Sequence, residues 1–207
     1  MHSSRSNDNL QGQDAQRVGR GFTEYEGTGY DFKAVLAGAN MQNGNPHDLQ
    51  KPMASVIPRI QEVQKPDAEI DESAAAEVHN TVYPKGRAQY EKAGELTTEG
   101  IGAAATIEAL LTFARGGARL AQEGPGHQSL ISKLLGMAMS EAVRLYDKGG
   151  GTADNGSAAD VMTAAGQATL KLLIQNQVQG ALGGDYNNSV YGSNAGQILN
   201  LAAKFKT

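Results

Sequence analysis

Apolar residues recur at helical spacing along most of this chain, most clearly from residue 128 to residue 179. Two long segments there, LISKLLGMAMSEAVRLYDK and AADVMTAAGQATLKLLIQNQ, are separated by a glycine-rich turn. Apolar side chains every three or four residues are typical of an amphipathic helix. Two such helices joined by a short turn form an antiparallel hairpin. The sequence therefore predicts a core hairpin over 128–179.

The two helices of the predicted hairpin each carry one apolar face. The residues expected on these faces are Ile131, Leu134, Leu135, Ala138, Ala142, Leu145, Tyr146, Val161, Ala164, Ala165, Ala168, Leu172 and Val178. The second helix has a start signal in Ser157, which is followed three residues later by Asp160. This resembles a capping box with aspartate in place of glutamate.

The same spacing predicts further helices over 32–40, 47–64, 67–83, 97–116 and 194–205. Proline is poorly tolerated inside a helix, so Pro58 is expected to interrupt the second of these. The polar stretch 85–96 is expected to be a linker. The fold class is therefore all-α, a single helical bundle-like domain of about six helices over 29–207.

Residues 1–28 differ from the rest because Ser, Asn, Gln, Arg and Gly dominate them. So little apolar area cannot offset the entropy of ordering the chain. We expect a disordered polar tail, with an aromatic arm around GFTEYEGTGYDF as the alternative.

The helix over 97–116 is unusually slim at its start, where Gly100, Gly102 and several alanines follow one another. Glycine inside a helix costs about 1 kcal/mol relative to alanine. A close crossing with another helix is the expected compensation.

The terminal helix, 194–205, carries its apolar stripe on Ile198, Leu201, Ala202 and Phe205. A helix this short is not stable alone in water, so it must cover something. We expect it to dock onto the hairpin of its own chain, with exchange into a neighbouring copy as the alternative.

Composition and charge narrow the possible functions. A net charge of −4 gives no electrostatic footprint for nucleic acid. The absence of cysteine excludes disulfides and thiolate zinc sites. The start of the chain lacks the apolar region of a secretory signal, and no run reaches the roughly 18 apolar residues of a membrane span. We expect a soluble, intracellular and cytoplasmic protein without a membrane span.

The sequence offers little that could carry catalysis. The turn GGGTADNGSA has the glycine spacing of a phosphate loop but lacks its lysine, and it joins two helices rather than a strand and a helix. None of the four histidines has a metal-ligating partner at helical spacing, and no nucleophile elbow occurs. We therefore predict no catalytic residue, no metal ligand and no cofactor.

Two pairs of residues are candidates for a structural or binding role. Glu141 and Lys171 each lie within an otherwise apolar helix of the hairpin. Long charged side chains commonly extend to water, and the alternative is a partly buried pair across the hairpin. His79 and Tyr83 are four residues apart on one helix, which is a packing distance.

Several segments resemble the fungal "beta-flanking" proteins, which carry a fungal domain of unknown function. The similarity lies in LLGMAMSEAVRLYD, AADVMTAAGQATLKLLIQNQ and the terminal LNLAAKF, and upstream in YDFKAVLAGAN, AAAEVHNTVY and GIGAAATIEALLTFARGG. His79 and Tyr83 match a histidine and tyrosine of that family. The resemblance covers roughly residues 30–207 and implies an all-helical fold and a fungal origin. It implies no activity, cofactor or catalytic residue.

Two classes of function remain. The sequence favours an interaction or scaffold module without catalysis, which binds a protein partner or forms a homo-oligomer. The alternative is a helical bundle that binds a small hydrophobic ligand in an internal cavity and could be an enzyme. Met137, Met139 and Met162 are the residues expected to line such a cavity.

Overall fold

The computed structural model describes residues 32–41, 46–60, 69–120, 130–151, 156–176 and 191–206. All regular structure in these ranges is helical, which confirms the predicted all-α fold class. The elements in chain order are α2 (Phe32–Met41), α3 (Pro46–Ile60), α4 (Glu72–Val82), the 3-10 turn η3 (Pro84–Gly86), α5 (Tyr90–Ala93), α6 (Thr98–Leu120), α7 (Leu130–Lys148), α8 (Ala158–Gln175) and α9 (Tyr191–Lys204). The predicted tail, 1–28, lies outside the described residues.

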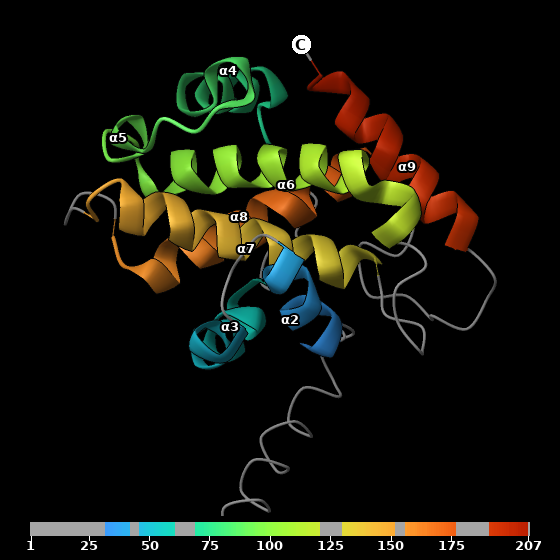
Figure 1. Cartoon of the computed structure of the whole chain (residues 1–207), viewed down its shortest axis with the longest axis horizontal. Coiled ribbons are helices and arrows are strands. Elements are labelled where there is room, and N and C mark those ends of the chain that lie inside the picture. The colour runs from blue at the N-terminus through green and yellow to red at the C-terminus, as the bar shows by residue number, and fades with distance from the viewer. Residues whose placement is uncertain are drawn as a thin grey trace, which may run out of the picture.

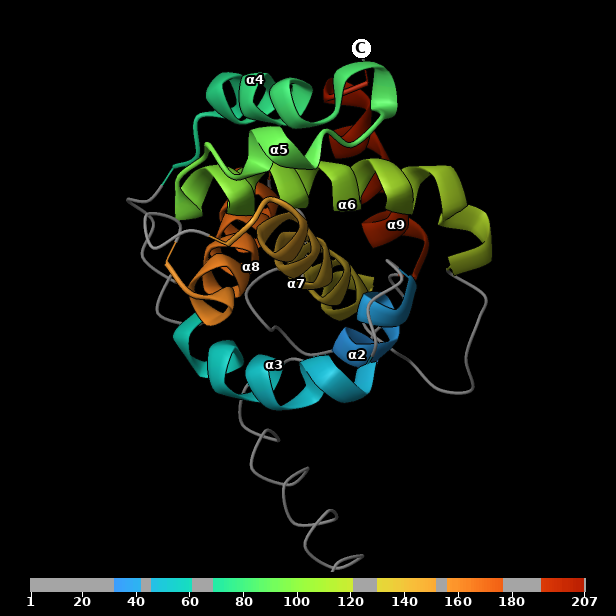
Figure 2. The ribbon, with the colours of Figure 1, turned by 60° about the vertical axis from the view of Figure 1, so that its left-hand side comes forward.

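The helices are arranged around α7. In Figure 1, α6, α7 and α8 form the middle of the molecule, with α4 and α5 on one side and α2 and α3 on the other. Figure 2 looks along α7 and shows α6, α8, α2 and α3 surrounding it. Helix α7 packs extensively against α2, α6 and α8, so it is the central helix of the fold.

Burial of α7 extends well beyond the one apolar face predicted for it. Every residue from 130 to 142 is buried, including Ser132, Lys133, Ser140 and Glu141. A helix that is buried all round must be approached by neighbours on every side. The small residues of α7 allow that approach.

The closest helix crossing joins α2 to α7. A Cβ atom built on Gly136 would lie 1.7 Å from the carbonyl oxygen of Val35, and one built on Gly38 would lie 1.9 Å from that of Lys133. Both distances are far inside van der Waals contact. The two helices therefore meet backbone to backbone, and only glycine fits at either position.

Two more glycines allow close contacts with α8, one against backbone and one against a side chain. A Cβ on Gly102 of α6 would lie 2.7 Å from the backbone of Ala164, and one on Gly166 would lie 2.2 Å from the Cδ1 atom of Ile60 in α3. The close crossing predicted from the glycines of α6 therefore occurs at Gly102. Gly100 is not part of it, since its nearest neighbour is Leu96 at 3.4 Å.

Local signals set the helix starts that matter for the site. Ser157 and Asp160 form a reciprocal capping box at the start of α8, as their spacing indicated. At the start of α4, the Asp71 carboxylate accepts hydrogen bonds from the backbone N–H groups of Ser73 and Ala74. Both aspartates thus satisfy N–H groups that a helix start leaves unpaired.

Several expectations about helix limits were wrong. Helix α3 continues through Pro52 and Pro58 to Ile60 without the predicted interruption, and the Ser55 hydroxyl donates to the Pro52 carbonyl oxygen. The stretch expected to be a linker, 85–96, contains η3 and α5, so the described part of the chain has more helices than the six or so predicted.

The terminal helix α9 begins at Tyr191, earlier than the predicted residue 194. Its stripe of Ile198, Leu201, Ala202 and Phe205 is buried as expected. It packs mainly against α6, however, and not against the hairpin of α7 and α8. The hairpin's faces are already covered by α2, α3 and α6, which leaves the far half of α6 as the apolar surface to be covered.

Replacing Gly136 with alanine tests the backbone contact between α2 and α7. Alanine favours the helix by about 1 kcal/mol, but its Cβ would collide with the Val35 carbonyl oxygen. We expect Gly136→Ala to lower the free energy of unfolding by about 1–3 kcal/mol, as overpacking does. Gly196→Ala in α9 is the matched control because a Cβ there meets nothing within 4 Å. Urea unfolding of both variants measures the difference, and a Gly136→Ala protein as stable as the control would contradict the close crossing.

Candidate functional site

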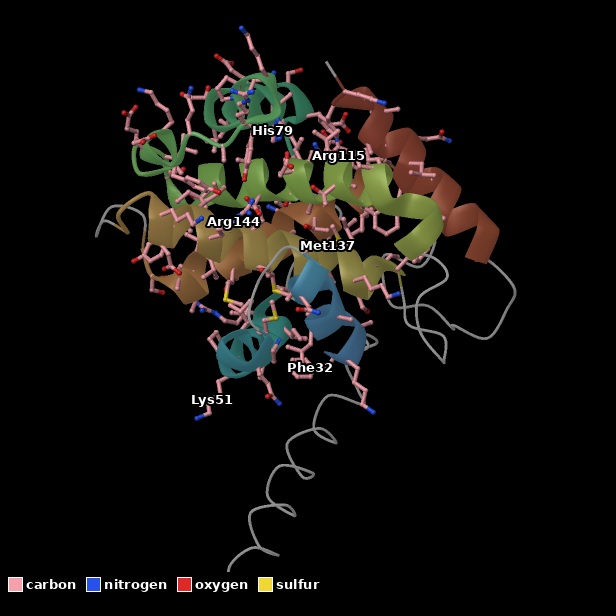
Figure 3. The ribbon with its side chains drawn as sticks, in the orientation of Figure 1. Phe32, Lys51, His79, Arg115, Met137 and Arg144 are labelled. Atoms are coloured by element: carbon pink, nitrogen blue, oxygen red, sulfur yellow. The ribbon has the colours of Figure 1, made fainter. Side chains whose placement is uncertain are left out.

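A buried carboxylate lies at the centre of a polar network between α4 and α7. Glu141 of α7 is 0% exposed, and the Tyr83 hydroxyl at the end of α4 donates a hydrogen bond to its Oε1 atom. The Arg144 Nη2 atom lies 2.7 Å from both carboxylate oxygens, with hydrogen-bond geometry toward Oε1. Figure 3 shows Arg144 on α7 on the side facing α4 and α5. The arginine compensates a charge that would otherwise be costly to bury.

The surroundings of Tyr83 and Arg144 keep each of these two side chains in one protonation state. Burial, reinforced by the charge of Glu141 and the hydrogen bond to it, raises the pKa of the Tyr83 hydroxyl far above its usual value of 10. Burial acts most strongly and would lower the pKa of Arg144, but the charge of Glu141, the hydrogen bond to it, Tyr90 and Tyr83 together outweigh burial and raise the pKa. Tyr83 is therefore a permanent hydrogen-bond donor and Arg144 a permanent cation.

Hydrogen bonding in the network is incomplete. The Glu141 Oε2 and Arg144 Nε atoms are buried and have no hydrogen-bond partner among the described residues. An unsatisfied buried polar atom costs stability. The network therefore contributes little net stability, and its main effect is to hold Tyr83, Glu141 and Arg144 in fixed positions relative to one another.

A second polar contact holds the last turn of α4 against α6. The His79 ring stacks on the Tyr83 ring, with centroids 4.9 Å apart and planes at 21°. Its Nε2 atom lies 3.1 Å from the Glu108 Oε2 atom, and Arg115 and Thr112 bind the Oε1 atom of the same carboxylate. Figure 3 shows His79 and Arg115 at this side of the molecule.

The pKa of Glu108 is lowered below its ordinary value of 4.5. Burial acts to raise this pKa, but the hydrogen bond from His79 and the charge of Arg115 outweigh burial. The carboxylate is thus more acidic in the folded than in the unfolded chain. Its contribution to stability is complete above the ordinary value and is lost as the pH falls through the lowered one.

Helix α4 depends on these contacts because it buries few residues of its own. Only Ala75, His79 and Val82 of α4 are buried. Tyr90 of α5 adds a neighbouring support, with the Lys148 ammonium 4.7 Å and the Arg144 guanidinium 6.0 Å from the centroid of its ring. At the start of α4, Glu72 accepts a hydrogen bond from the Asn176 side chain and pairs with Lys204 of α9. Polar contacts at both ends and three buried residues therefore hold α4 in place.

The structure separates one pair of candidate residues and brings the other together. His79 and Tyr83 form the stack described above. Glu141 and Lys171 are not partners. The Glu141 side chain of α7 is enclosed against the end of α4, whereas Lys171 of α8 lines a groove on the surface. The possibility that Glu141 extends to water is also wrong, because α7 is covered all round at that level.

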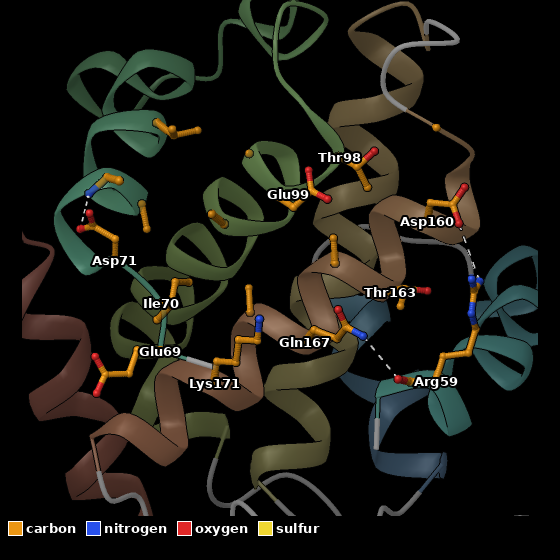
Figure 4. Close-up of a pocket in the computed structure, with 18 residues that line it drawn as sticks. Arg59, Glu69, Ile70, Asp71, Thr98, Glu99, Asp160, Thr163, Gln167 and Lys171 are labelled. Atoms are coloured by element: carbon orange, nitrogen blue, oxygen red, sulfur yellow. Dashed lines mark hydrogen bonds and ion pairs between the residues drawn. The ribbon is translucent and has the colours of Figure 1, made fainter. Parts of the chain in front are cut away.

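That groove is a hollow on the described surface with a volume of about 620 Å³. It lies between the starts of α4 and α6 and one face of α8 from Asp160 to Lys171, next to the end of α3 (Figure 4). Small apolar residues make up its floor, namely Ile70, Ala74, Ala75, Val78, Gly100, Ala103, Ala164 and Ala168. Polar and charged side chains surround this floor: Arg59, Glu69, Asp71, Thr98, Glu99, Asp160, Thr163, Gln167 and Lys171.

Contacts between elements fix the walls of the groove. At one end the Ile70 N–H donates to the Gln175 Oε1 atom, which joins the start of α4 to the end of α8. On the far side of α8, the Gln167 amide donates to the Arg59 carbonyl oxygen, and the Arg59 guanidinium lies 3.7 Å from the Asp160 carboxylate. Figure 4 shows both contacts of Arg59.

The described residues offer little for covalent or metal chemistry. No group of three or more His, Asp or Glu side chains within them is placed to hold a metal ion. The glycine-rich turn keeps Gly150, Gly151 and Gly156 at positive φ, and the Tyr146 hydroxyl donates to the Gly156 carbonyl oxygen. Residues 152–155 of the turn lie outside the described ranges. The described residues do provide a concave groove that is lined by alanines and surrounded by charged side chains.

Arg144 and the groove were not predicted from the sequence. Arg144 is three residues after Glu141 on a helix, a spacing at which an ion pair forms, so this signal was available. The groove had no local signal, because its floor is assembled from alanines of three helices that are far apart in sequence.

Comparison with known proteins finds a similar family for part of the chain. Residues 31–118 are similar to a family described as a domain of unknown function (DUF7721). The similar region runs from α2 to α6 and so includes His79, Tyr83 and the α4 and α6 walls of the groove. No curated protein and no solved structure matches the chain. None of the helices described here is long and apolar enough to cross a membrane.

Replacing Tyr83 with phenylalanine tests the buried network. The change removes the hydroxyl that donates to Glu141 and leaves a buried carboxylate less satisfied, so we expect a loss of about 1–3 kcal/mol in the free energy of unfolding. Tyr146→Phe is the control, because that hydroxyl binds a backbone oxygen at an exposed position and should cost about 1 kcal/mol or less. Equal losses for the two variants in urea unfolding would show that the network does not anchor α4.

Proposed function

We propose that this protein is a helical interaction module without catalysis, and that the groove between α4, α6 and α8 receives a helix of a protein partner. The observation that carries the proposal is the alanine floor of the groove. Small side chains allow a partner helix to approach closely. The many van der Waals contacts of the two closely packed surfaces then replace the contacts that large side chains would make. A helix lying in an apolar groove is a common mode of peptide recognition.

The dimensions of the groove fit a short helix. Along α8, the lining residues Asp160, Ala164, Gln167 and Lys171 follow one another on a single face. From the first to the last of them the helix rises about 16 Å at 1.5 Å per residue, which equals about three helical turns. Elsewhere on the described surface, Leu199 is the large hydrophobic residue that stands exposed, at 38%. The groove is therefore the best candidate for a docking surface.

The buried network does not favour catalysis. Tyr83 and Glu141 are enclosed and do not line the groove. A general acid or base must reach the proton that it transfers. The network instead positions α4, which forms one wall of the groove.

A second candidate is a small hydrophobic ligand, which the volume of the groove favours. About 620 Å³ lies within the range of small-molecule sites. Native mass spectrometry of protein purified from its own source separates the two candidates, because a retained small-molecule mass would support the ligand.

The proposal also covers the origin of the protein and its place in the cell. The resemblance to fungal "beta-flanking" proteins supports a fungal origin, and the family similarity at 31–118 is compatible with it. We propose a cytoplasmic protein whose partner is another protein, with a second copy of the chain as the alternative.

Selection from a displayed library of amphipathic helices about three turns long tests the docking proposal. We expect the wild-type protein to enrich helical peptides, and Ala74→Trp to abolish their binding because an indole there fills the groove. Ala74 is exposed on α4 and lines the groove, so the folded protein should accept the change.

Asn80→Trp is the matched control, since Asn80 is exposed on the same helix but is not part of the groove lining. It should bind the selected peptides as wild type does. Failure to enrich any peptide, or equal binding by Ala74→Trp, would overturn the proposed function. Circular dichroism and thermal unfolding of both variants show that each is folded.

A further inference from the structure

The two long edges of the groove carry opposite charges. The edge formed by the start of α4 and the start of α6 holds three acids, Glu69, Asp71 and Glu99, and no base. The edge formed by α8 and the end of α3 holds both bases of the lining, Lys171 and Arg59, with Asp160 as its acid. Figure 4 shows Glu69, Asp71 and Glu99 on one side of the groove and Arg59 on the other, with Lys171 rising from α8 between them.

Some of these charges already have structural partners. Asp71 caps α4, while Asp160 caps α8 and pairs with Arg59. The hydrogen bonds from Ser157 lower the pKa of Asp160, so this carboxylate stays charged. Glu69, Glu99 and Lys171 have no ion-pair partner among the described residues. The unpaired charges are thus acidic on the edge of α4 and α6 and basic on the edge of α8.

We propose that the partner is an amphipathic helix whose narrow apolar stripe is flanked by Lys or Arg on one side and by Glu or Asp on the other. This inference rests on the proposed function and specifies the chemistry of the occupant. The apolar stripe lies on the alanines of the floor, the basic flank faces Glu99 and Glu69, and the acidic flank faces Lys171.

Flanking charges of this kind set orientation and partner choice in helix pairs. In coiled coils, charged residues beside an apolar seam select the partner and its direction. Here one long edge of the groove is acidic and the other is basic. A bound helix with charged flanks therefore has one favourable rotation about its own axis. For a helix that lies in a given direction along the groove, exchanged flanks would place like charges together, which is unfavourable. The edges therefore supply specificity, while the small-residue floor supplies contact.

Two synthetic peptides of identical composition test the inference. Each has the same stripe of alanine and leucine over about three turns, and they differ only in which flank carries lysine and which carries glutamate. One carries the proposed flanks and the other has them exchanged. We expect the peptide with the proposed flanks to bind about tenfold more tightly at low salt, with the ratio shrinking as salt screens the charges.

Charge reversal in the protein should invert this preference. In the double variant Glu99→Lys, Lys171→Glu the peptide with exchanged flanks should bind more tightly. The control Glu77→Lys, Lys51→Glu reverses two exposed charges outside the groove lining with the same net charge and should keep the wild-type preference. Isothermal titration calorimetry of the three proteins with each peptide gives one ratio of affinities per protein, three ratios in all.

The outcomes separate the inference from the function on which it rests. Equal binding of the two peptides, together with loss of both in Ala74→Trp, would overturn the charge assignment and leave the docking groove intact. If neither peptide binds, or if Ala74→Trp binds them as wild type does, both proposals fail. A concentration-dependent dimer of the wild type that Ala74→Trp abolishes would identify a second copy as the occupant and overturn the proposed partner.

Discussion

The backbone contact between α2 and α7 is the constraint on which the fold depends. Gly38 and Gly136 bring the two helices so close that a single methyl group at either position would overlap a carbonyl oxygen of the other helix. With α2 seated at this distance, α7 can be covered on that side while α6 and α8 cover the others. The central helix is thereby buried from residue 130 to residue 142, polar residues included. Close packing of small side chains thus takes the place of a core of large ones.

The polar contacts of α4 follow from the burial of α7. Once α7 is enclosed, Glu141 cannot extend to water, and it requires both the Tyr83 hydroxyl and the Arg144 guanidinium. Tyr83 stacks on His79, which contacts Glu108 of α6, so the last turn of α4 is fixed to both α7 and α6. The start of α4 then forms a wall of the groove. The buried charge of Glu141 in α7 therefore helps to position α4, which lies at the surface and far from Glu141 in the sequence.

The sequence predicted those parts of the fold whose signals are local. Helical periodicity located the hairpin, and Ser157 with Asp160 marked the start of its second helix. It did not predict the burial of Glu141, because a long charged side chain on an apolar helix ordinarily reaches water. The hydrogen-bond partner Tyr83 is 58 residues away in sequence, so no local pattern relates the two. The docking of α9 on α6 was also beyond local signals, since it depends on which apolar faces the other helices leave open.

Native-state hydrogen exchange, resolved by residue, tests the central claim most directly. If α7 is the enclosed centre and α4 is held mainly by polar contacts, amides of α7 should exchange only through global unfolding, whereas amides of α4 should exchange through a smaller opening at lower free energy. Amides of α7 that exchange as readily as those of α4 would contradict this account of the fold.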